Sequence, residues 1–353
     1  MNIFQQIPSH ELKSGMIVAK DFTINNLTLL TKGTEITENI AEKIKLNFPL
    51  SDIVIYSETN PNNALLFENR NSIKISNIEK SFDKMSEIAE NIFDSIKNTD
   101  KFNMSEVRCI SDSIMEQLTE TGLVIRNIID ERNEDKYLTR HCVNVATISS
   151  LIGRWLQLPK KELIFLTYAA LLHDIGKIKI NPRILNKKSK LTEDEINLCR
   201  THSTLGYDIA KKVPYIDQSI LFGILFHHER EDGTGYPLKI KGPQIPKFAK
   251  IIAIADIFDA MTSNRVYKNK LCALDVLEEI KCEIFGKLDP IIGTIFIDNI
   301  LNYYIGELVV LNNGKIGKVV KIDSNSITRP LLSLEGNLVN LINESTLRIV
   351  DLI

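Results

Sequence analysis

The sequence predicts a mainly α fold with a small strand-rich module at each end. Two observations carry this prediction. Apolar residues recur at three- and four-residue steps through the middle of the chain. Near both ends, apolar residues instead alternate with polar ones on either side of turn-forming pairs. The 353 residues also support more than one domain. We therefore expect a strand-rich module over 1–60, a helical linker region over 61–130, a helical domain over 131–304 and a second strand-rich module over 305–353.

In the N-terminal module, "MIVAKDF" and "LTLLTKGTEIT" flank the pair Asn25-Asn26, which predicts a hairpin. A short helix is expected from Thr37 to Leu46, followed by a strand in "DIVIYS". The stretch "ETNPNNA" is rich in turn formers and predicts the end of this module.

The helical pattern begins near Ile78, where apolar residues line one helical face as far as Ile96. A second helical run covers about Ser105 to Asp130. These helices either cover the next domain or pair with a second subunit in a homodimer, and the sequence does not choose between the two.

Two short motifs predict elements later in the chain. In "LTEDEINLCRTH", Thr192 and Glu195 have the spacing of a capping box, which predicts the start of a helix. In "GELVVLNNGKIGKVVKI", apolar residues alternate around Asn313-Gly314, which predicts a hairpin in the C-terminal module.

Composition excludes several classes of protein. The net charge of -2 gives no general attraction to nucleic acid, and no apolar run approaches the length of a membrane-spanning helix. The start of the chain has no pattern of a secretory signal. The five dispersed cysteines, without CxxC spacing, suit reduced thiols. We expect a cytoplasmic protein that binds neither nucleic acid nor membrane.

Histidines are concentrated in the helical domain, which holds five of the six in the chain. A single histidine would be read as a core residue, but two aspartates accompany these five on apolar stretches. Burying a carboxylate is costly unless its charge is compensated, and a divalent metal bound by carboxylates and imidazoles does this. For Asp256 the alternative is a cap on a neighbouring helix. The candidate ligands are His141, His173, Asp174, His202, His227, His228 and Asp256.

The adjacent pair His227-His228 needs a particular geometry. Consecutive residues project about 100° apart on a helix, so the two imidazoles cannot bind a metal as an i, i+4 pair does. Near a helix end both reach one metal; alternatively, one binds metal while the other meets substrate. Five imidazoles and two carboxylates exceed the demand of one ion, which favours two metals sharing a carboxylate. Such mixed ligands suit iron, manganese or zinc.

The order H…HD…H…HH…D, with "HDIGK", "HHEREDGTGYP" and "ADIFDAMTSNRVYK", resembles the HD-GYP family of cyclic di-GMP phosphodiesterases. This family belongs to the HD superfamily of metal-dependent phosphohydrolases. The resemblance covers roughly 131–300, and the tripeptide Gly235 to Pro237 follows the HHE of His227 to Glu229 at the family's distance. It implies an HD-type helical bundle with a metal centre, and it favours iron or manganese. The N-terminal module is similar to one often found ahead of such domains.

The resemblance also implies how the ligands divide. His141, His173, Asp174 and Asp256 would surround one metal; His202, His227 and His228 would hold the second, with Asp174 bridging. Some family members hold a third metal with a glutamate four residues before the first histidine. That position is Tyr137 here, so we expect a binuclear centre, although Glu134 or Asp135 are alternatives for a third site.

Further residues have expected roles beside the metals. Lys177 would bind a phosphoryl oxygen or orient the nucleophile, its alternative being a solvated lysine. Arg265 and Lys268 would contact phosphate, or form an ordinary charge pair at a helix end. Tyr236 would stack on a guanine or meet a partner, such as a diguanylate cyclase domain at the GYP loop. Asp259 and Thr262 are candidates to support the ligands.

The function that the resemblance implies is hydrolysis of cyclic di-GMP to linear pGpG, with GMP as an alternative final product. Another cyclic dinucleotide, cyclic GMP-AMP, is an alternative substrate. A different class of function is a non-catalytic sensor of cyclic dinucleotides, although all seven candidate ligands are present. A general HD phosphohydrolase lacks the HHE and GYP elements.

Overall fold

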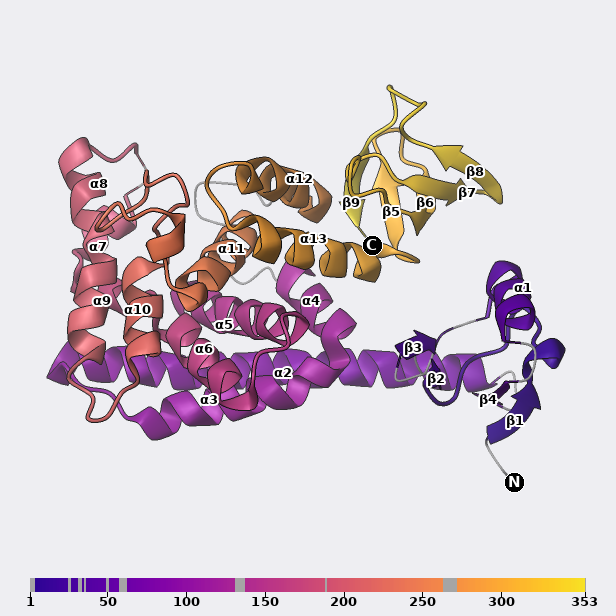
Figure 1. The fold of residues 1–353 in the computed structure, drawn as a ribbon, viewed down its shortest axis with the longest axis horizontal. Coiled ribbons are helices and arrows are strands. Elements are labelled where there is room, and N and C mark those ends of the chain that lie inside the picture. The colour runs from indigo at the N-terminus through magenta and orange to yellow at the C-terminus, as the bar shows by residue number, and fades with distance from the viewer. Residues whose placement is uncertain are drawn as a thin grey trace. The chain divides into compact units, whose positions relative to one another are not determined.

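The computed structural model describes residues 4–24, 27–30, 34, 36–48, 51–56, 62–130, 137–187, 189–262 and 272–352. The chain forms two compact units, Met1–Ser72 and Ile73–Ile353. Their helices and strands confirm the mainly α fold with small strand-rich modules (Figure 1). The finer division of the sequence at residues 60, 130 and 304 stays a prediction.

The first unit is built on two antiparallel strand pairs. Strand β1 (Phe4–Pro8) pairs with β4 (Asp52–Tyr56), and β2 (Phe22–Ile24) pairs with β3 (Leu27–Leu30) across the predicted hairpin. Helix α1 (Glu38–Asn47) begins as predicted, because the side chain of Thr37 accepts a hydrogen bond from the backbone of Ile40. Ile53 and Ile55 of β4 lie in the small core of this unit.

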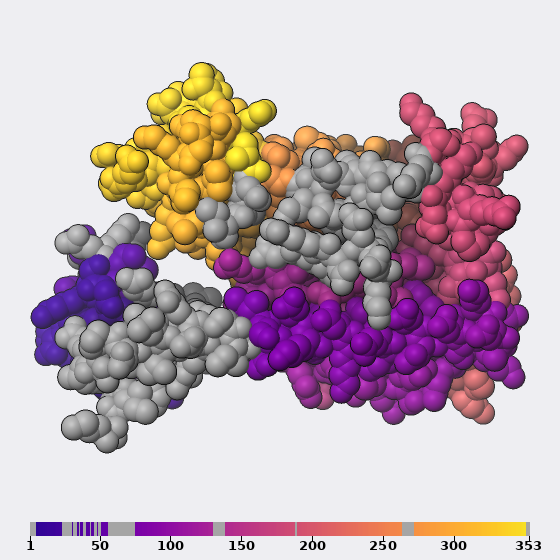
Figure 2. All heavy atoms as spheres, turned by 180° about the vertical axis from the view of Figure 1, so that it is seen from behind, coloured from indigo at the N-terminus to yellow at the C-terminus, as the bar shows by residue number. Residues whose placement is uncertain are grey.

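Helix α2 (Asn62–Thr99) begins earlier than the sequence predicted. The stretch "ETNPNNA" was expected to be a boundary, yet its last residues already belong to the helix. The reason is that asparagine is tolerated in a first helical turn, where backbone N–H groups have no partner in the helix. From Ile78 on, apolar side chains such as Phe82 and Met85 are buried in the large core. Figure 2 shows this part of α2 as a strip along the second unit.

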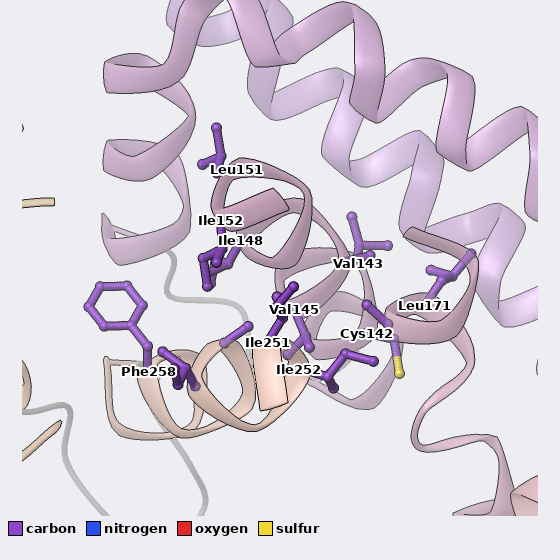
Figure 3. Close-up of a cluster of buried hydrophobic side chains, with 14 of the residues drawn as sticks. Cys142, Val143, Val145, Ile148, Leu151, Ile152, Leu171, Ile251, Ile252 and Phe258 are labelled. Carbon is purple, nitrogen blue, oxygen red and sulfur yellow. The ribbon is translucent and has the colours of Figure 1, made fainter. Parts of the chain in front are cut away.

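Three helices form the centre of the second unit. Helix α5 (Tyr137–Trp155) packs against both α6 (Lys160–Leu172) and α11 (Lys247–Thr262). In Figure 3, side chains of α5, including Val145 and Ile148, face Ile251 and Phe258 of α11. These helices are apolar on more than one face, so they are buried on several sides and give the site a rigid frame.

The remaining helices surround this centre. Helix α3 contacts both α5 and α6, so the predicted helical run before residue 130 covers the next domain. The capping box at the start of α8 is confirmed, since both of its hydrogen bonds form. The elements are α3 (Met104–Gln117), η2 (Leu118–Glu120), α4 (Thr121–Asp130), η3 (Ile175–Lys179), α7 (Pro182–Leu185), α8 (Glu193–Arg200), α9 (His202–Ala210), α10 (Gln218–Phe226), η4 (Gly242–Gln244), α12 (Ala273–Ile284) and α13 (Pro290–Tyr304).

The C-terminal strands form one antiparallel sheet in the order β8-β7-β6-β5-β9. The predicted hairpin at Asn313-Gly314 joins its strands β5 and β6. Val309, Val319 and Leu332 form its own small core. The strands are β5 (Leu308–Leu311), β6 (Ile316–Lys321), β7 (Leu331–Leu334), β8 (Asn337–Asn340) and β9 (Ile349–Leu352).

Two expectations from composition can be compared with the structure. Within the described ranges, no helix combines the length and the apolar character needed to cross a membrane. All five cysteines are described, and each is a free thiol.

Candidate metal centre

The seven predicted ligands come together where the ends of α6, α8 and α10 meet α5 and α11. His173 and Asp174 follow α6, His202 follows α8, and His227 and His228 follow α10. His141 lies on α5 and Asp256 on α11. They form two groups whose ligand atoms lie within 4.8 Å of one another: His141, His173 and Asp256; and Asp174, His202, His227 and His228.

The carboxylate of Asp174 lies between the two groups. Its Oδ2 is 3.5 Å from Nε2 of His141 and 3.4 Å from Nε2 of His173. Its Oδ1 is 3.3 Å from Nε2 of His202. One side chain therefore offers one oxygen to each group, which is the arrangement of a bridging carboxylate.

Three of the histidines are oriented by the same kind of hydrogen bond, from Nδ1 to a backbone carbonyl. Nδ1 of His173 donates to the carbonyl of Ala170 at 2.7 Å, and Nδ1 of His227 donates to that of Ile224 at 2.7 Å. Nδ1 of His202 donates to the carbonyl of Cys199 at 2.8 Å. The last carbonyls of a helix have no partner within it, so a histidine at the helix end can use one. Because a carbonyl only accepts, the hydrogen is on Nδ1 and each Nε2 presents a lone pair to the centre.

These lone pairs provide a test of whether a metal fits. Nε2 of His202 lies only 3.2 Å from Nε2 of His227. Burial lowers the pKa of both imidazoles, so neither carries a second proton to share. The buried Nε2 of His173 makes no hydrogen bond with any described residue. Converging lone pairs beside a carboxylate are unfavourable alone, but they are the donor set of a divalent transition metal.

His141 is oriented differently, by a carboxylate. Its Nδ1 lies 2.6 Å from Oδ2 of Asp259, whose other oxygen accepts from Nδ2 of Asn144 at 2.8 Å. Such a carboxylate fixes the tautomer of a metal-binding histidine. The expected supporting role fits Asp259. The hydroxyl of Thr262 donates to the carbonyls of Phe258 and Asp259, and its supporting role stays a prediction. Asn144 was missed, although it lies three residues after His141 on one helical face.

The ionisable side chains of the two ligand groups shift one another's pKa values. Burial would lower the pKa of His141, but hydrogen bonds with Asp256 and Asp259 outweigh it and raise that pKa to about 9. Burial would raise the pKa of Asp174, but the positive charge of Lys177 contributes to holding that pKa well below its usual range. Lys177 forms an ion pair with Oδ2 of Asp174. The site thus holds Asp174 as a carboxylate even before any metal binds.

A cavity of about 530 Å³ opens onto this centre. Lys177, His228, Asp256 and Tyr236 are among the residues that line it. The part next to the ligand groups, lined by Lys177, His228 and Asp256, is called its inner end below. The ring of Tyr236 stacks on that of His228, with centroids 4.6 Å apart and 27° between the planes. The guanidinium of Arg200 lies 5.4 Å from the centre of the Tyr236 ring. Tyr236 therefore contacts a candidate metal ligand, His228, and also lines the cavity.

The loop that carries Tyr236 is held close to the end of α10. Oε1 of the buried Glu229 accepts from the backbone of Leu238 at 2.7 Å, and the backbone of Tyr236 donates to His228 at 3.2 Å. Gly233 has a φ of +80°, which favours glycine. At Gly235 the reason is space, because a Cβ there would lie 2.4 Å from Cα of Glu229.

Some expected residues fall outside what the structure describes. Arg265 and Lys268 lie in 263–271, and Glu134 and Asp135 lie in 131–136, both outside the described residues. Tyr137 is the first residue of α5, and its side chain is not described. The expectations for these residues stay predictions.

Comparisons with known proteins agree with this geometry. The family model for the HD domain matches residues 123–290. A cyclic di-GMP phosphodiesterase of Pseudomonas aeruginosa is 32% identical over 219 residues, which cover 62% of this chain and 53% of that protein. The 3'3'-cGAMP-specific phosphodiesterase 3 of Vibrio cholerae is 37% identical over 167 residues, covering 46% of this chain and 35% of that protein. The chain thus spans about half or less of the length of these curated relatives.

A solved structure matches over most of the chain. It is a protein of Bdellovibrio bacteriovorus described as an HDG"Y"P protein, with a TM-score of 0.53 and 17% identity over 84% of this chain and 99% of that chain. At this identity the likeness shows the fold. Residues 123–290 are thus similar to HD domains, in agreement with the helical fold and the clustered histidines and aspartates. With "HDIGK" and "HHEREDGTGYP" in place, the chain is similar to HD-domain phosphodiesterases of the HD-GYP type.

Proposed function

We propose that this chain is a metal-dependent phosphodiesterase that hydrolyses cyclic di-GMP to linear pGpG, and onward to GMP. The observation that carries the proposal is the carboxylate of Asp174, shared between two ligand groups at the inner end of a cavity. The names of the relatives from Pseudomonas aeruginosa and Thermotoga maritima, both cyclic di-GMP phosphodiesterases, support it.

The proposed cofactors are two divalent ions, iron or manganese. His141, His173 and Asp256 would hold one and His202, His227 and His228 the other, with Asp174 between them. When bound, such a pair activates water and neutralises the charge of a phosphodiester. The chain's own contribution is to fix the ligands: helix-end carbonyls orient three imidazoles and Asp259 orients a fourth.

The remaining groups would position the substrate. Lys177, at the inner end of the cavity, would donate to a phosphoryl oxygen, since charge-assisted hydrogen bonds to phosphate are strong. Arg265 and Lys268 are proposed as further phosphate contacts. Tyr236 is proposed to contact the nucleotide through the part of its ring that is not stacked on His228.

A second candidate substrate is cyclic GMP-AMP. The likeness to a relative in Vibrio cholerae named as a 3'3'-cGAMP-specific phosphodiesterase favours it. A diguanylate cyclase domain at the GYP loop, a homodimer and a cytoplasmic location also stay proposals. The five free thiols support the proposal of a cytoplasmic location.

The test uses the full chain, purified without oxygen and loaded with iron or manganese. We expect about two ions per chain by elemental analysis, as a two-metal site requires, and conversion of cyclic di-GMP to the linear product. Asp174→Ala should abolish turnover and lower the metal content, because both groups lose a ligand. Asp208→Ala, at an exposed ion pair with Lys211, serves as the control and should behave as wild type. Tight nucleotide binding without turnover, across several metals, would favour the sensor.

A further inference from the structure

Two helices that carry none of the proposed phosphate contacts also line the cavity. Helix α11 contributes an apolar patch, and α12 contributes a face with two carboxylates. These lining residues are Ile257, Ala260 and Met261 of α11, and Glu279, Ile280 and Glu283 of α12.

The two glutamates lie one helical turn apart, so they share a face of α12. They differ in their partners. Glu283 accepts a hydrogen bond from Nζ of Lys287 at 3.3 Å. Glu279 is exposed toward the cavity and has no hydrogen bond or ion pair with any residue that the structure describes. Glu279 therefore has acceptor capacity left for a ligand.

Carboxylates are unexpected in a cavity for an anionic dinucleotide, because they repel its phosphates. Their presence is understandable if they face a base and not a phosphate. A carboxylate only accepts hydrogen bonds, and it can accept two from adjacent donors. Guanine presents two such donors, N1–H and the N2 amino group, on its Watson–Crick edge. Adenine presents one donor beside the lone pair of N1, which a carboxylate repels.

The geometry points to Glu279 as the residue that reads a guanine of the substrate. The base would lie against the apolar patch of Ile257, Ala260 and Met261, while the phosphodiester lies at the inner end of the cavity. This assignment rests on the proposed function and extends it, because the charged groups at the inner end read phosphate and do not distinguish bases. It makes α12 the element that selects guanine over adenine.

The experiment measures equilibrium binding to the metal-loaded full chain. The probes are phosphorothioate analogues of cyclic di-GMP and cyclic di-AMP, which resist hydrolysis. Glu279→Ala should weaken binding of the guanine analogue by about 10- to 100-fold, as expected for charge-assisted hydrogen bonds, and leave the adenine analogue unchanged or tighter. Glu279→Gln should bind the adenine analogue more tightly than wild type, because an amide offers one acceptor and one donor to the adenine edge.

The matched control is Glu278→Gln, which removes the same charge from the same helix outside the cavity lining, where Glu278 pairs with Lys281. It should leave both affinities unchanged. If Glu279→Gln tightens both analogues equally, Glu279 acts only by charge repulsion and the assignment is wrong. The assignment also fails if wild type binds the guanine analogue and Glu279→Ala binds it equally well, although the proposed function then survives. A wild-type chain that binds neither analogue contradicts both.

Discussion

At the scale of single residues, the site depends on which nitrogen of each histidine carries hydrogen. Every imidazole whose Nδ1 donates to a fixed acceptor presents Nε2 to the centre. The sequence predicted which residues gather here, because aspartate on an apolar segment is costly to bury unless a metal, held together with histidine, compensates its charge. It did not predict the acceptors, since a backbone carbonyl has no signature in the sequence. Asp259 was only a candidate, and Asn144 was missed.

The role of Asp259 gives a prediction at this scale. Asp259→Asn removes the charge that holds His141, and the amide no longer fixes which nitrogen of the imidazole carries hydrogen. We expect the affinity for manganese or iron to fall by about 10- to 100-fold. Titration of metal-free protein against a competing chelator measures it. Asp298→Asn, at an exposed position on α13, is the control and should leave the affinity unchanged. An equal affinity in both variants would show that Asp259 does not support the ligand.

At the scale of elements, an ion triad ties the loop after α10 to two helices. Nζ of Lys250, on α11, lies 2.9 Å from Oε1 of Glu231 in the loop and 3.0 Å from Oδ2 of Asp289, which caps α13. The sequence did not indicate this ion triad, because the three residues are far apart in the chain. Helices such as α5 were predictable from periodicity, whereas the early start of α2 was not. Its first turn carries turn-forming residues.

Replacing Lys250 tests the triad. Lys250→Met leaves two carboxylates facing each other, and we expect a loss of about 1–3 kcal/mol in the free energy of unfolding at neutral pH. Burial raises the pKa of Asp289, but the backbone of Ile292 and Lys250 outweigh this and lower it below 3.8. Its contribution is therefore present above pH 3.8 and is lost as the pH falls through the lower folded value. The cost of the substitution should shrink in the same range.

Urea unfolding of wild type and variant at several pH values checks this. Lys211→Met, which breaks an exposed ion pair with Asp208, is the control and should cost less than about 1 kcal/mol. A cost for Lys250→Met no larger than that of the control, at every pH, would show that the triad does not stabilise the loop.

At the scale of the whole molecule, every candidate ligand and the core that holds it lie in the unit Ile73–Ile353. The sequence anticipated this grouping, because the histidines cluster in one helical stretch. It did not anticipate that the C-terminal sheet would share a unit with the helices. Ile327, buried in the large helical core, is one of the residues that joins them.

This organisation predicts the behaviour of a shortened chain. A protein of residues 73–353 should fold and bind as much metal as the full chain, because its ligands and their supports are intact. Circular dichroism and elemental analysis measure both properties, with Asp174→Ala in the shortened chain as the low-metal reference. If the shortened chain folds but its metal content is no higher than that of the reference, the first unit is needed to form the centre.

The histidines at the helix ends have a consequence for how the protein acquires its ions. Each is aimed by a carbonyl three residues earlier in the chain, so its direction is set when the helix forms. The ligands are thus arranged before any ion arrives, and little ordering remains for the binding step. Loading should then be reversible in the folded state: a chelator removes the ions without unfolding the chain, and added ions restore them without a refolding step.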